Sequence, residues 1–164
     1  MKIVVFSDSH GNRANMQQVL EIERPHVVFH LGDGRQDIKA VMEQWPDVEL
    51  FSVVGNCDWR SRGNTEQLVV VEGVRFLLSH GHYYGVKSGL QTYVTYGHNN
   101  RADVLLFGHT HEPCLWDDRD MILLNPGSVG AYGEPTYAVI QVKDGEVLDV
   151  RHKVVPDPVY EYGL

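Results

Sequence analysis

Five short apolar runs in this sequence each end close to a residue that can bind a metal ion. The runs cover residues 3–6, 27–31, 50–54, 74–79 and 104–107, and the polar residues that follow them are Asp8, His10, Asp33, Asn56, His80, His109 and His111. Runs of this length that are rich in Val, Ile, Leu and Phe indicate strands buried on both faces. Ligands of such sheets lie at the carboxyl ends of the strands. The pattern therefore predicts that five strand ends converge on one edge and bring these side chains together.

Helical patterns separate the first three runs. Residues 12–23 and 37–45 carry apolar side chains at helical spacing, and Pro25 and Pro46 follow them. This alternation indicates a parallel βαβ sheet with right-handed crossovers. Further along, we expect a hairpin of strands 68–71 and 74–79, a helix over 86–96, and antiparallel strands over 114–116, 121–124, 137–142 and 147–150 with turns at 117–118 and 144–145. The chain is thus predicted to be one α/β domain whose second half is mainly β.

Length, charge and cysteine content narrow the class of protein. A chain of 164 residues fits a single domain. No run of about 18 apolar residues predicts a membrane span, and the first apolar run is too short for a signal peptide. Two cysteines make no disulfide framework, so we expect a cytoplasmic protein. The net charge of -8 makes extended nucleic acid an unfavourable partner, although the acidity also fits carboxylates held near cations.

The kinds of residue at the strand ends indicate a catalytic metal site. A single Asp or His in a turn usually has no special role. Burying so many carboxylates and imidazoles together is costly unless cations pair with them. Mixed imidazole, carboxylate and amide donors suit manganese, iron, zinc or nickel, unlike a cysteine-rich structural zinc site. Glycines beside the ligands are expected to allow sharp turns and to leave room for substrate, and these are Gly32, Gly55, Gly81 and Gly108.

The order of these residues resembles the signature of the calcineurin-like metallophosphoesterases. Its parts are Asp8-x-His10, Gly32-Asp33, Gly55-Asn56-x-Asp58, His80 and Gly108-His109-x-His111, and they span nearly the whole chain. The compact length and the later sequence 125–128, Asn-Pro-Gly-Ser, are similar to the small YfcE-type phosphodiesterase branch, which also includes the scaffold subunit of retromer. The resemblance implies a four-layer αββα sandwich of two mixed sheets. It would place the catalytic domain at residues 1–155 and leave 156–164 as a C-terminal tail.

The same resemblance implies which residues bind metal and what they do. Two divalent cations, with manganese favoured over iron, zinc or nickel, would share Asp33. The first would take Asp8, His10, Asp33 and His111, and the second Asp33, Asn56, His80 and His109. A hydroxide between the two cations would attack phosphorus in line, so the expected activity is hydrolysis of a small phosphodiester.

Three further residues near the expected ligands have open roles. Cys57 stands where many family members have a histidine that protonates the leaving group, and a thiol is a weak proton donor. A nucleophilic Cys57 is the less favoured alternative. Asp58 is expected to orient a ligand or cap its loop, and His82 is either a substitute acid or a solvated loop histidine. Together with Asp33 and Asn56, these are the candidate catalytic residues.

Other functions and surfaces stay open at this point. A binding scaffold like the retromer subunit and a phosphomonoesterase or nucleotidase are the alternative functions. Residues 125–128 are expected to form a tight turn under the site. Tyr83, Tyr84, Tyr93 and Tyr96 either line a pocket or belong to the core. In the tail, Val159, Tyr160 and Tyr162 are expected to cover an apolar groove on this subunit or on a neighbour in a homo-oligomer.

Overall fold

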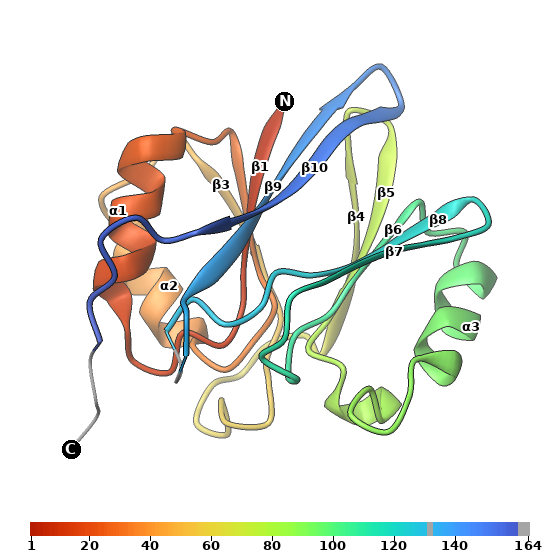
Figure 1. Ribbon diagram of the computed structural model, residues 1–164, viewed down its shortest axis with the longest axis horizontal. Coiled ribbons are helices and arrows are strands. Elements are labelled where there is room, and N and C mark those ends of the chain that lie inside the picture. The colour runs from red at the N-terminus through yellow and green to blue at the C-terminus, as the bar shows by residue number, and fades with distance from the viewer. Residues whose placement is uncertain (131–132, 161–164) are drawn as a thin grey trace.

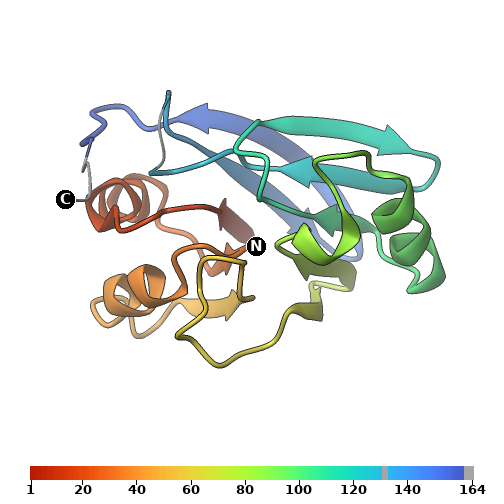
Figure 2. The same cartoon turned by 90° about the horizontal axis from the view of Figure 1, so that it is seen from below.

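The computed structural model describes residues 1–130 and 133–160, which form two five-stranded sheets with helices on their outer faces. The helices are α1 (Arg13–Glu23), α2 (Arg35–Met42) and α3 (Gln91–Asn99), with one 3-10 turn, η1 (His82–Tyr84). The strands are β1 (Lys2–Phe6), β2 (Val27–His30), β3 (Glu49–Ser52), β4 (Glu66–Val71), β5 (Val74–Ser79), β6 (Val104–Leu106), β7 (Cys114–Asp118), β8 (Met121–Asn125), β9 (Thr136–Lys143) and β10 (Glu146–Val154). Figures 1 and 2 show α1 and α2 outside one sheet and α3 outside the other, which confirms the four-layer sandwich.

The first sheet contains the parallel unit predicted from the sequence. Its strand order is β10-β9-β1-β2-β3, with β1, β2 and β3 parallel and β9 antiparallel to β1. Alternate residues of β1 face opposite layers, as the period of a strand requires. Ile3 and Val5 pack between the two sheets, whereas Val4 and Phe6 pack against the helices. This burial on both faces explains why the run is continuously apolar.

The second sheet has the order β4-β5-β6-β8-β7. The pair β4 and β5 forms the predicted hairpin, and β7 pairs with β8 in the antiparallel sense. The antiparallel pairing expected for β7 and β8 is thus confirmed, and the other neighbour of β8 in the sheet, β6, is parallel to it. The two sheets pack through a core that includes the ring contact of Phe29 with Phe76 at 5.1 Å between centroids.

Two helices and one turn differ from the sequence prediction. The segment 86–96 is not one helix, because α3 starts only at Gln91 and Gly85 and Gly89 before it have positive φ. Glycines with positive φ interrupt a right-handed helix. Helix α2 begins two residues earlier than expected and ends at Met42, not Trp45. The turn between β7 and β8 lies at Arg119 and Asp120, two residues later than the predicted pair.

The described part of the tail lies along α1 of the same chain. The Val159 carbonyl accepts from Asn12 Nδ2 at 2.6 Å, and the Val159 amide donates to Asn15 Oδ1 at 2.8 Å. Val159 and Tyr160 both remain about half exposed, and Tyr162 lies outside the described residues. In the described part of the chain, every helix is too short or too polar to cross a membrane.

Candidate metal centre

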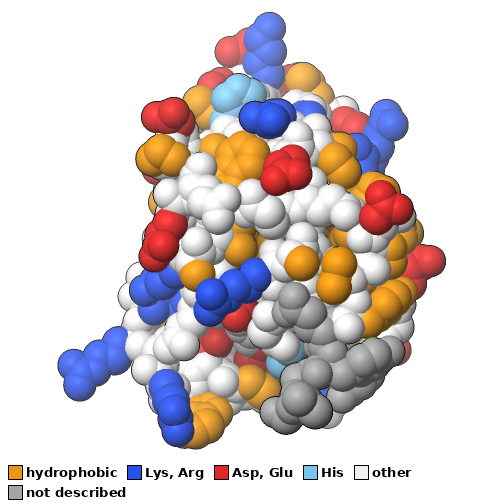
Figure 3. Space-filling model, turned by 90° about the vertical axis from the view of Figure 1, so that its left-hand side faces the viewer, with side chains coloured by type: hydrophobic (Ala, Val, Ile, Leu, Met, Phe, Trp, Pro, Cys, Tyr) orange, Lys and Arg blue, Asp and Glu red, His pale blue; other side chains and the backbone are white. Residues whose placement is uncertain are grey.

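The segments after β1, β2, β3, β5 and β6 meet at one end of the sandwich, at the bottom of Figure 1 and facing the viewer in Figure 2. The prediction of a single edge needs one correction. The first three strands belong to one sheet, whereas β5 and β6 belong to the other. In Figure 3, acidic and histidine side chains lie in a recess at this end, and Lys or Arg side chains project from its margin.

Asp8, His10 and His111 form one group of converging donor atoms. Oδ1 of Asp8 lies 3.2 Å from Nε2 of His111 and 3.6 Å from Nε2 of His10. The two imidazole Nε2 atoms are 3.3 Å apart. The other carboxylate oxygen of Asp8 is already held by the Ser7 hydroxyl and by the backbone amide of His109. Oδ1 therefore points away from its structural partners and toward the two histidines.

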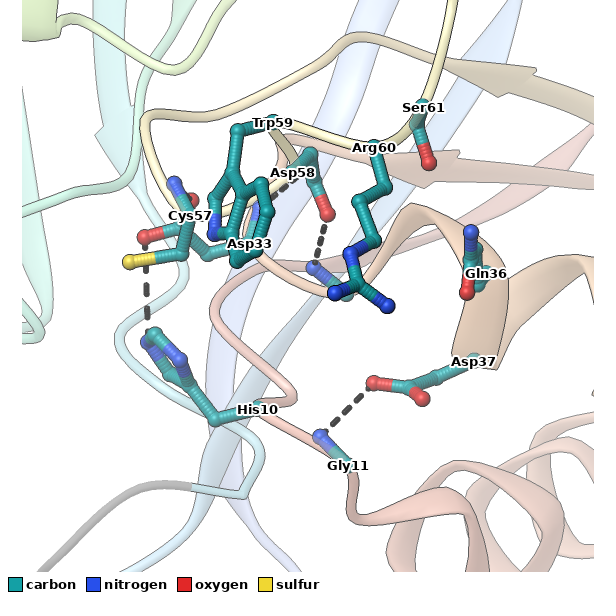
Figure 4. A pocket seen from close by; sticks show the side chains of 11 residues that line it. His10, Gly11, Asp33, Gln36, Asp37, Cys57, Asp58, Trp59, Arg60 and Ser61 are labelled. Atoms are coloured by element: carbon teal, nitrogen blue, oxygen red, sulfur yellow. Dashed lines mark hydrogen bonds and ion pairs between the residues drawn. The ribbon is translucent and has the colours of Figure 1, made fainter.

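Asp33, His80, His109 and Asn56 form the second group. One donor atom each from Asp33, His80 and His109 lies within 4.8 Å of the others. Nε2 of His80 is 3.2 Å from Asp33 Oδ2 and 3.0 Å from Asn56 Oδ1. Asp33 Oδ2 is also 3.8 Å from Nε2 of His10, a contact drawn in Figure 4. Asp33 thus lies between the two groups, and the structure brings all seven candidate ligands together.

The backbone fixes which nitrogen of His80 faces the site. Nδ1 of this buried histidine lies 2.7 Å from the carbonyl oxygen of Leu31. A carbonyl only accepts, so Nδ1 carries a proton, and in the neutral imidazole that binds metal the lone pair of Nε2 faces Asp33 and Asn56. Metal-binding histidines are commonly oriented by such a hydrogen bond on the distal nitrogen.

Strained backbone coincides with the candidate ligands. In the described residues, ten positions other than glycine have positive φ, and five of them are Asp8, His10, Asp33, His109 and His111. This conformation is uncommon for residues with a Cβ. It costs of order 1–3 kcal/mol each and gathers at functional sites. The turns that direct these side chains inward therefore have an energetic cost that the rest of the fold must offset.

The glycines beside the ligands make room for the ligands themselves. A Cβ on Gly55 would lie 2.2 Å from Asp33 Oδ1, and one on Gly108 would lie 2.7 Å from Asp8 Oδ2. The space is filled by the Asp33 carboxylate at Gly55, and by the Ser7 hydroxyl and the Asp8 carboxylate at Gly108. The expectation that they leave room for substrate is therefore wrong.

The ionisation of the site follows from close pairing of carboxylates and imidazoles. Burial opposes the charge of Asp8, but the nearby imidazoles of His10 and His111 lower the pKa of its carboxyl well below the usual range. The carboxylate of Asp8 in turn raises the pKa of His10. Burial lowers the pKa of His109 to about 4, and a charge on His80 acts in the same direction. Neutral imidazole and ionised carboxylate are the forms that bind metal.

These features meet the requirements of a divalent cation. Asp8 Oδ1 is buried and has no hydrogen-bond partner in the described residues. An isolated buried carboxylate oxygen is costly unless a cation or donor satisfies it. The donor set of oxygens and imidazole nitrogens is the one used by catalytic zinc, manganese and iron. The residues present therefore fit a metal centre.

Asp58 holds the loops that carry two of the candidate ligands. Its carboxylate accepts four backbone hydrogen bonds, from Asp33 at 2.7 Å, Gly55 at 2.8 Å, Gly34 at 2.9 Å and Arg35 at 3.1 Å. This geometry agrees with the expectation that Asp58 orients a ligand and caps its loop. The carboxylate is occupied by backbone donors, so Asp58 is a positioning residue.

A buried chain of side chains that no sequence pattern indicated supports the Asp8–His10 loop. The Gly32 amide donates to Nδ1 of His30 at 3.2 Å, so Nε2 of His30 carries the proton toward Ser9 Oγ at 3.1 Å. Ser9 in turn donates to Asp37 Oδ2 at 2.9 Å. A histidine at the end of an apolar strand was the only available signal. Its partners come from distant segments that no local pattern connects.

His30 predicts a pH dependence of folding. Burial lowers the pKa of His30 to about 4, from 6.5. In the unfolded chain His30 therefore binds a proton below about pH 6.5, whereas in the folded chain it does so only below about pH 4. The stabilisation is complete above pH 6.5 and is lost as the pH falls toward 4, by about 3 kcal/mol in all. Urea unfolding of chelator-treated protein at pH 7.5 and 4.5 should show a smaller loss in His30→Gln than in the wild type. Equal losses would contradict this prediction.

The loop at residues 125–128 supports the site from below, as expected. Gly127 donates its amide to Asn125 Oδ1 at 2.9 Å, which closes the turn. Asn125 Nδ2 donates to the Gly108 carbonyl at 3.0 Å, and Ser128 Oγ donates to the Asp8 carbonyl at 2.7 Å. This loop therefore positions the segments of both sheets that carry candidate ligands.

Cys57 and His82 border the donor groups. Sγ of Cys57 lies within 4.8 Å of donor atoms of His10 and Asp33. Burial and the neighbouring Asp33 raise the pKa of the Cys57 thiol. The ring of His82 is centred 5.4 Å from His80 and 6.1 Å from His109, and burial lowers the pKa of His82. Both residues are near the site without belonging to the two main groups.

The tyrosines behave as core residues, with one exception. Tyr93 is buried and donates to the Leu106 carbonyl at 2.8 Å. Tyr84 stacks on Tyr93, and the hydroxyls of Tyr84 and Tyr96 both donate to Glu66. Tyr83 is 73% exposed. The cluster of Tyr84, Tyr93 and Tyr96 fixes α3 against its sheet, and these three hydroxyls are held by partners outside the donor groups.

Comparisons with known proteins agree with this geometry. The sequence model of the calcineurin-like phosphoesterase superfamily domain matches residues 1–145. A probable metallophosphoesterase of Methanothermobacter thermautotrophicus is 36% identical over 160 residues, which cover 92% of this chain and 91% of that protein. The phosphodiesterase YfcE of Escherichia coli K12 is 28% identical, with 92% and 91% covered. Vps29 of Entamoeba histolytica, solved with zinc, is similar in fold, with a TM-score of 0.77 at 22% identity over 94% of this chain and 98% of that one.

Proposed function

Because this chain belongs to the calcineurin-like phosphoesterase superfamily, we propose that it is a metal-dependent phosphodiesterase acting at the strand-end centre. The observation that carries the proposal is the pair of donor groups with Asp33 between them. All seven ligand positions of the family signature are filled. A scaffold has no need to retain strained turns and a buried unpartnered carboxylate oxygen at such positions.

We assign two divalent cations to the two donor groups. Asp8, His10, Asp33 and His111 would hold one, and Asp33, Asn56, His80 and His109 the other, with manganese the first choice and iron, zinc or nickel the alternatives. Such a pair supplies an acidified water as nucleophile and neutralises charge on the phosphate. Asp33 is the one residue that belongs to both sets. The protein's own contribution is to hold these side chains in place before substrate arrives.

The residues around the centre favour diesters with good leaving groups. Cys57 takes the position of the usual general acid. Its raised pKa keeps the thiol protonated but makes it a weak proton donor. The same shift disfavours a nucleophilic thiolate. Burial lowers the pKa of His82, which disfavours the protonated imidazolium that a general acid requires. Catalysis then depends on the metal centre and on the leaving group itself.

A direct assay tests the proposed function. Protein stripped with chelator and reloaded with manganese should hydrolyse bis-p-nitrophenyl phosphate faster than p-nitrophenyl phosphate, and the stripped protein should be inactive. Bound metal is measured in the same samples. A faster monoester reaction would replace the proposal with a phosphomonoesterase. Full metal loading without turnover of either ester would favour a binding scaffold.

Replacing Cys57 by histidine is expected to help difficult leaving groups. Cys57→His introduces a stronger general acid beside Asp33 and His10, and general acids contribute about 10²-fold or more. The rate for a diester with an alkyl leaving group should therefore rise more than the rate for a p-nitrophenyl diester. The ratio of the two kcat/KM values is the measurement. A ratio equal to that of the wild type would remove the argument that an acid is missing.

Partners and compartment follow from charge and cysteines. The net charge of -8 disfavours extended nucleic acid, so we expect a small phosphodiester as substrate. Both cysteines, Cys57 and Cys114, are free thiols, which suits the cytoplasm. Association into a homo-oligomer stays a prediction.

A further inference from the structure

A pocket of about 360 Å³ opens directly beside the donor groups. One side is formed by His10, Asp33 and Cys57, which border the proposed metal centre. Trp59 and Arg60, from the same loop as Cys57, also line the pocket. Figure 4 shows these side chains extending from that loop toward the segments that carry His10 and Asp33. A phosphate held at the centre would therefore place one of its ester groups next to this pocket.

Trp59 is the most exposed large apolar side chain in the described residues. It is 76% exposed, and the Arg60 guanidinium lies over its ring at 4.8 Å from the centroid. With one face covered by Arg60, this exposure means that the other face of the indole is open to solvent. A large aromatic side chain exposed at the edge of a pocket offers a ligand a broad apolar face.

The charged side chains that line the pocket differ in whether they already have hydrogen-bond partners. Asp58 accepts four backbone hydrogen bonds, and Asp37 accepts from Ser9 and from the Gly11 amide at 2.8 Å. Arg60 is the only Lys or Arg that lines the pocket, and in the described part of the chain its guanidinium makes no hydrogen bond or ion pair. The pocket thus offers an open aromatic face and a free cation to an anionic ligand.

We propose that this pocket binds a planar aromatic group of the diester, as the base of a nucleotide, by stacking on Trp59, with Arg60 bracing the indole and attracting the phosphate. The inference rests on the proposed function and names its substrate class. Stacking of a base on an aromatic side chain is worth about 1–3 kcal/mol. That range corresponds to about 5- to 150-fold in affinity.

The test compares two ligands that differ only in the base. AMP and ribose 5-phosphate are measured as competitive inhibitors of bis-p-nitrophenyl phosphate hydrolysis by the manganese-loaded protein. The wild type should bind AMP at least about 5-fold more tightly. In Trp59→Ala the ratio of the two inhibition constants should fall to about one, through a loss of AMP affinity, whereas Trp59→Phe should keep most of the preference.

Trp116→Ala is the matched control, because Trp116 is also exposed, at 56%, and lines a different pocket with none of the candidate ligands. It should keep the wild-type ratio. A ratio near one in the wild type would overturn the inference, as would an equal loss for both ligands in Trp59→Ala. If the protein does not hydrolyse the diester at all, the proposed function fails instead, and calorimetric titration of the same two ligands still tests the pocket.

Discussion

Asp33→Asn is expected to lower kcat/KM for bis-p-nitrophenyl phosphate by about 10³-fold. The carboxylate lies between the two donor groups, with Oδ2 3.2 Å from His80 Nε2 and 3.8 Å from His10 Nε2. An amide of the same shape removes the negative charge shared by both proposed cations. Charge stabilisation by metal ions is worth several kcal/mol, and each 1.4 kcal/mol is about tenfold in rate.

Asp149→Asn provides the control for this substitution. Asp149 pairs with Arg151 on the surface at 2.7 Å and takes no part in the site. The control should keep wild-type activity and metal content. Asp33→Asn should still fold, as judged by circular dichroism, and should bind less manganese. Retention of more than a tenth of the wild-type kcat/KM by a metal-depleted Asp33→Asn protein would contradict the proposed role.

Asp58→Ala is expected to lower the free energy of unfolding by about 3 kcal/mol and to weaken metal binding 10- to 100-fold. The substitution leaves four backbone N–H groups without their acceptor, and each buried unsatisfied donor costs about 1–3 kcal/mol. Water will replace part of this loss at the open side of the loop. Residues that orient metal ligands affect metal affinity by such factors.

Urea unfolding and metal titration of the same variants separate the two effects. Asp118→Ala removes a surface partner of His98 at 2.7 Å and should cost less than about 1 kcal/mol. Asp58→Asn keeps one carbonyl acceptor and should fall between Asp58→Ala and the wild type. Equal stability of the Asp58 and Asp118 variants would show that the four hydrogen bonds contribute little.

The convergence of the candidate metal ligands could be predicted from sequence because the signal was local. Each candidate ligand follows an apolar run within a few residues, and a strand end determines where such a residue lies. The assignment of strands to the two sheets had no such local sequence signal. Placing β5 and β6 in a second sheet depends on packing such as that of Phe29 on Phe76. Sequence periodicity does not report contacts of this range.

The supporting residues show the same limit. His30 could be noticed as a polar residue in an apolar strand, but its partners Ser9 and Asp37 lie on other segments. The role of Gly55 was misjudged because the Asp33 carboxylate that fills its space comes from another strand end. The prediction of a helix at 86–96 was wrong for a local reason. The apolar spacing there was given more weight than Gly85 and Gly89, which have positive φ.

Each donor group takes members from both halves of the sandwich. Asp8 and His10 follow β1 and His111 follows β6, while Asp33 follows β2 and His80 follows β5. An ion bound by either group would therefore cross-link the two sheets at the end where their strands stop. Loss of such an ion would then free the two layers to separate at that end, so the proposed metal centre and the closure of the core would depend on the same side chains.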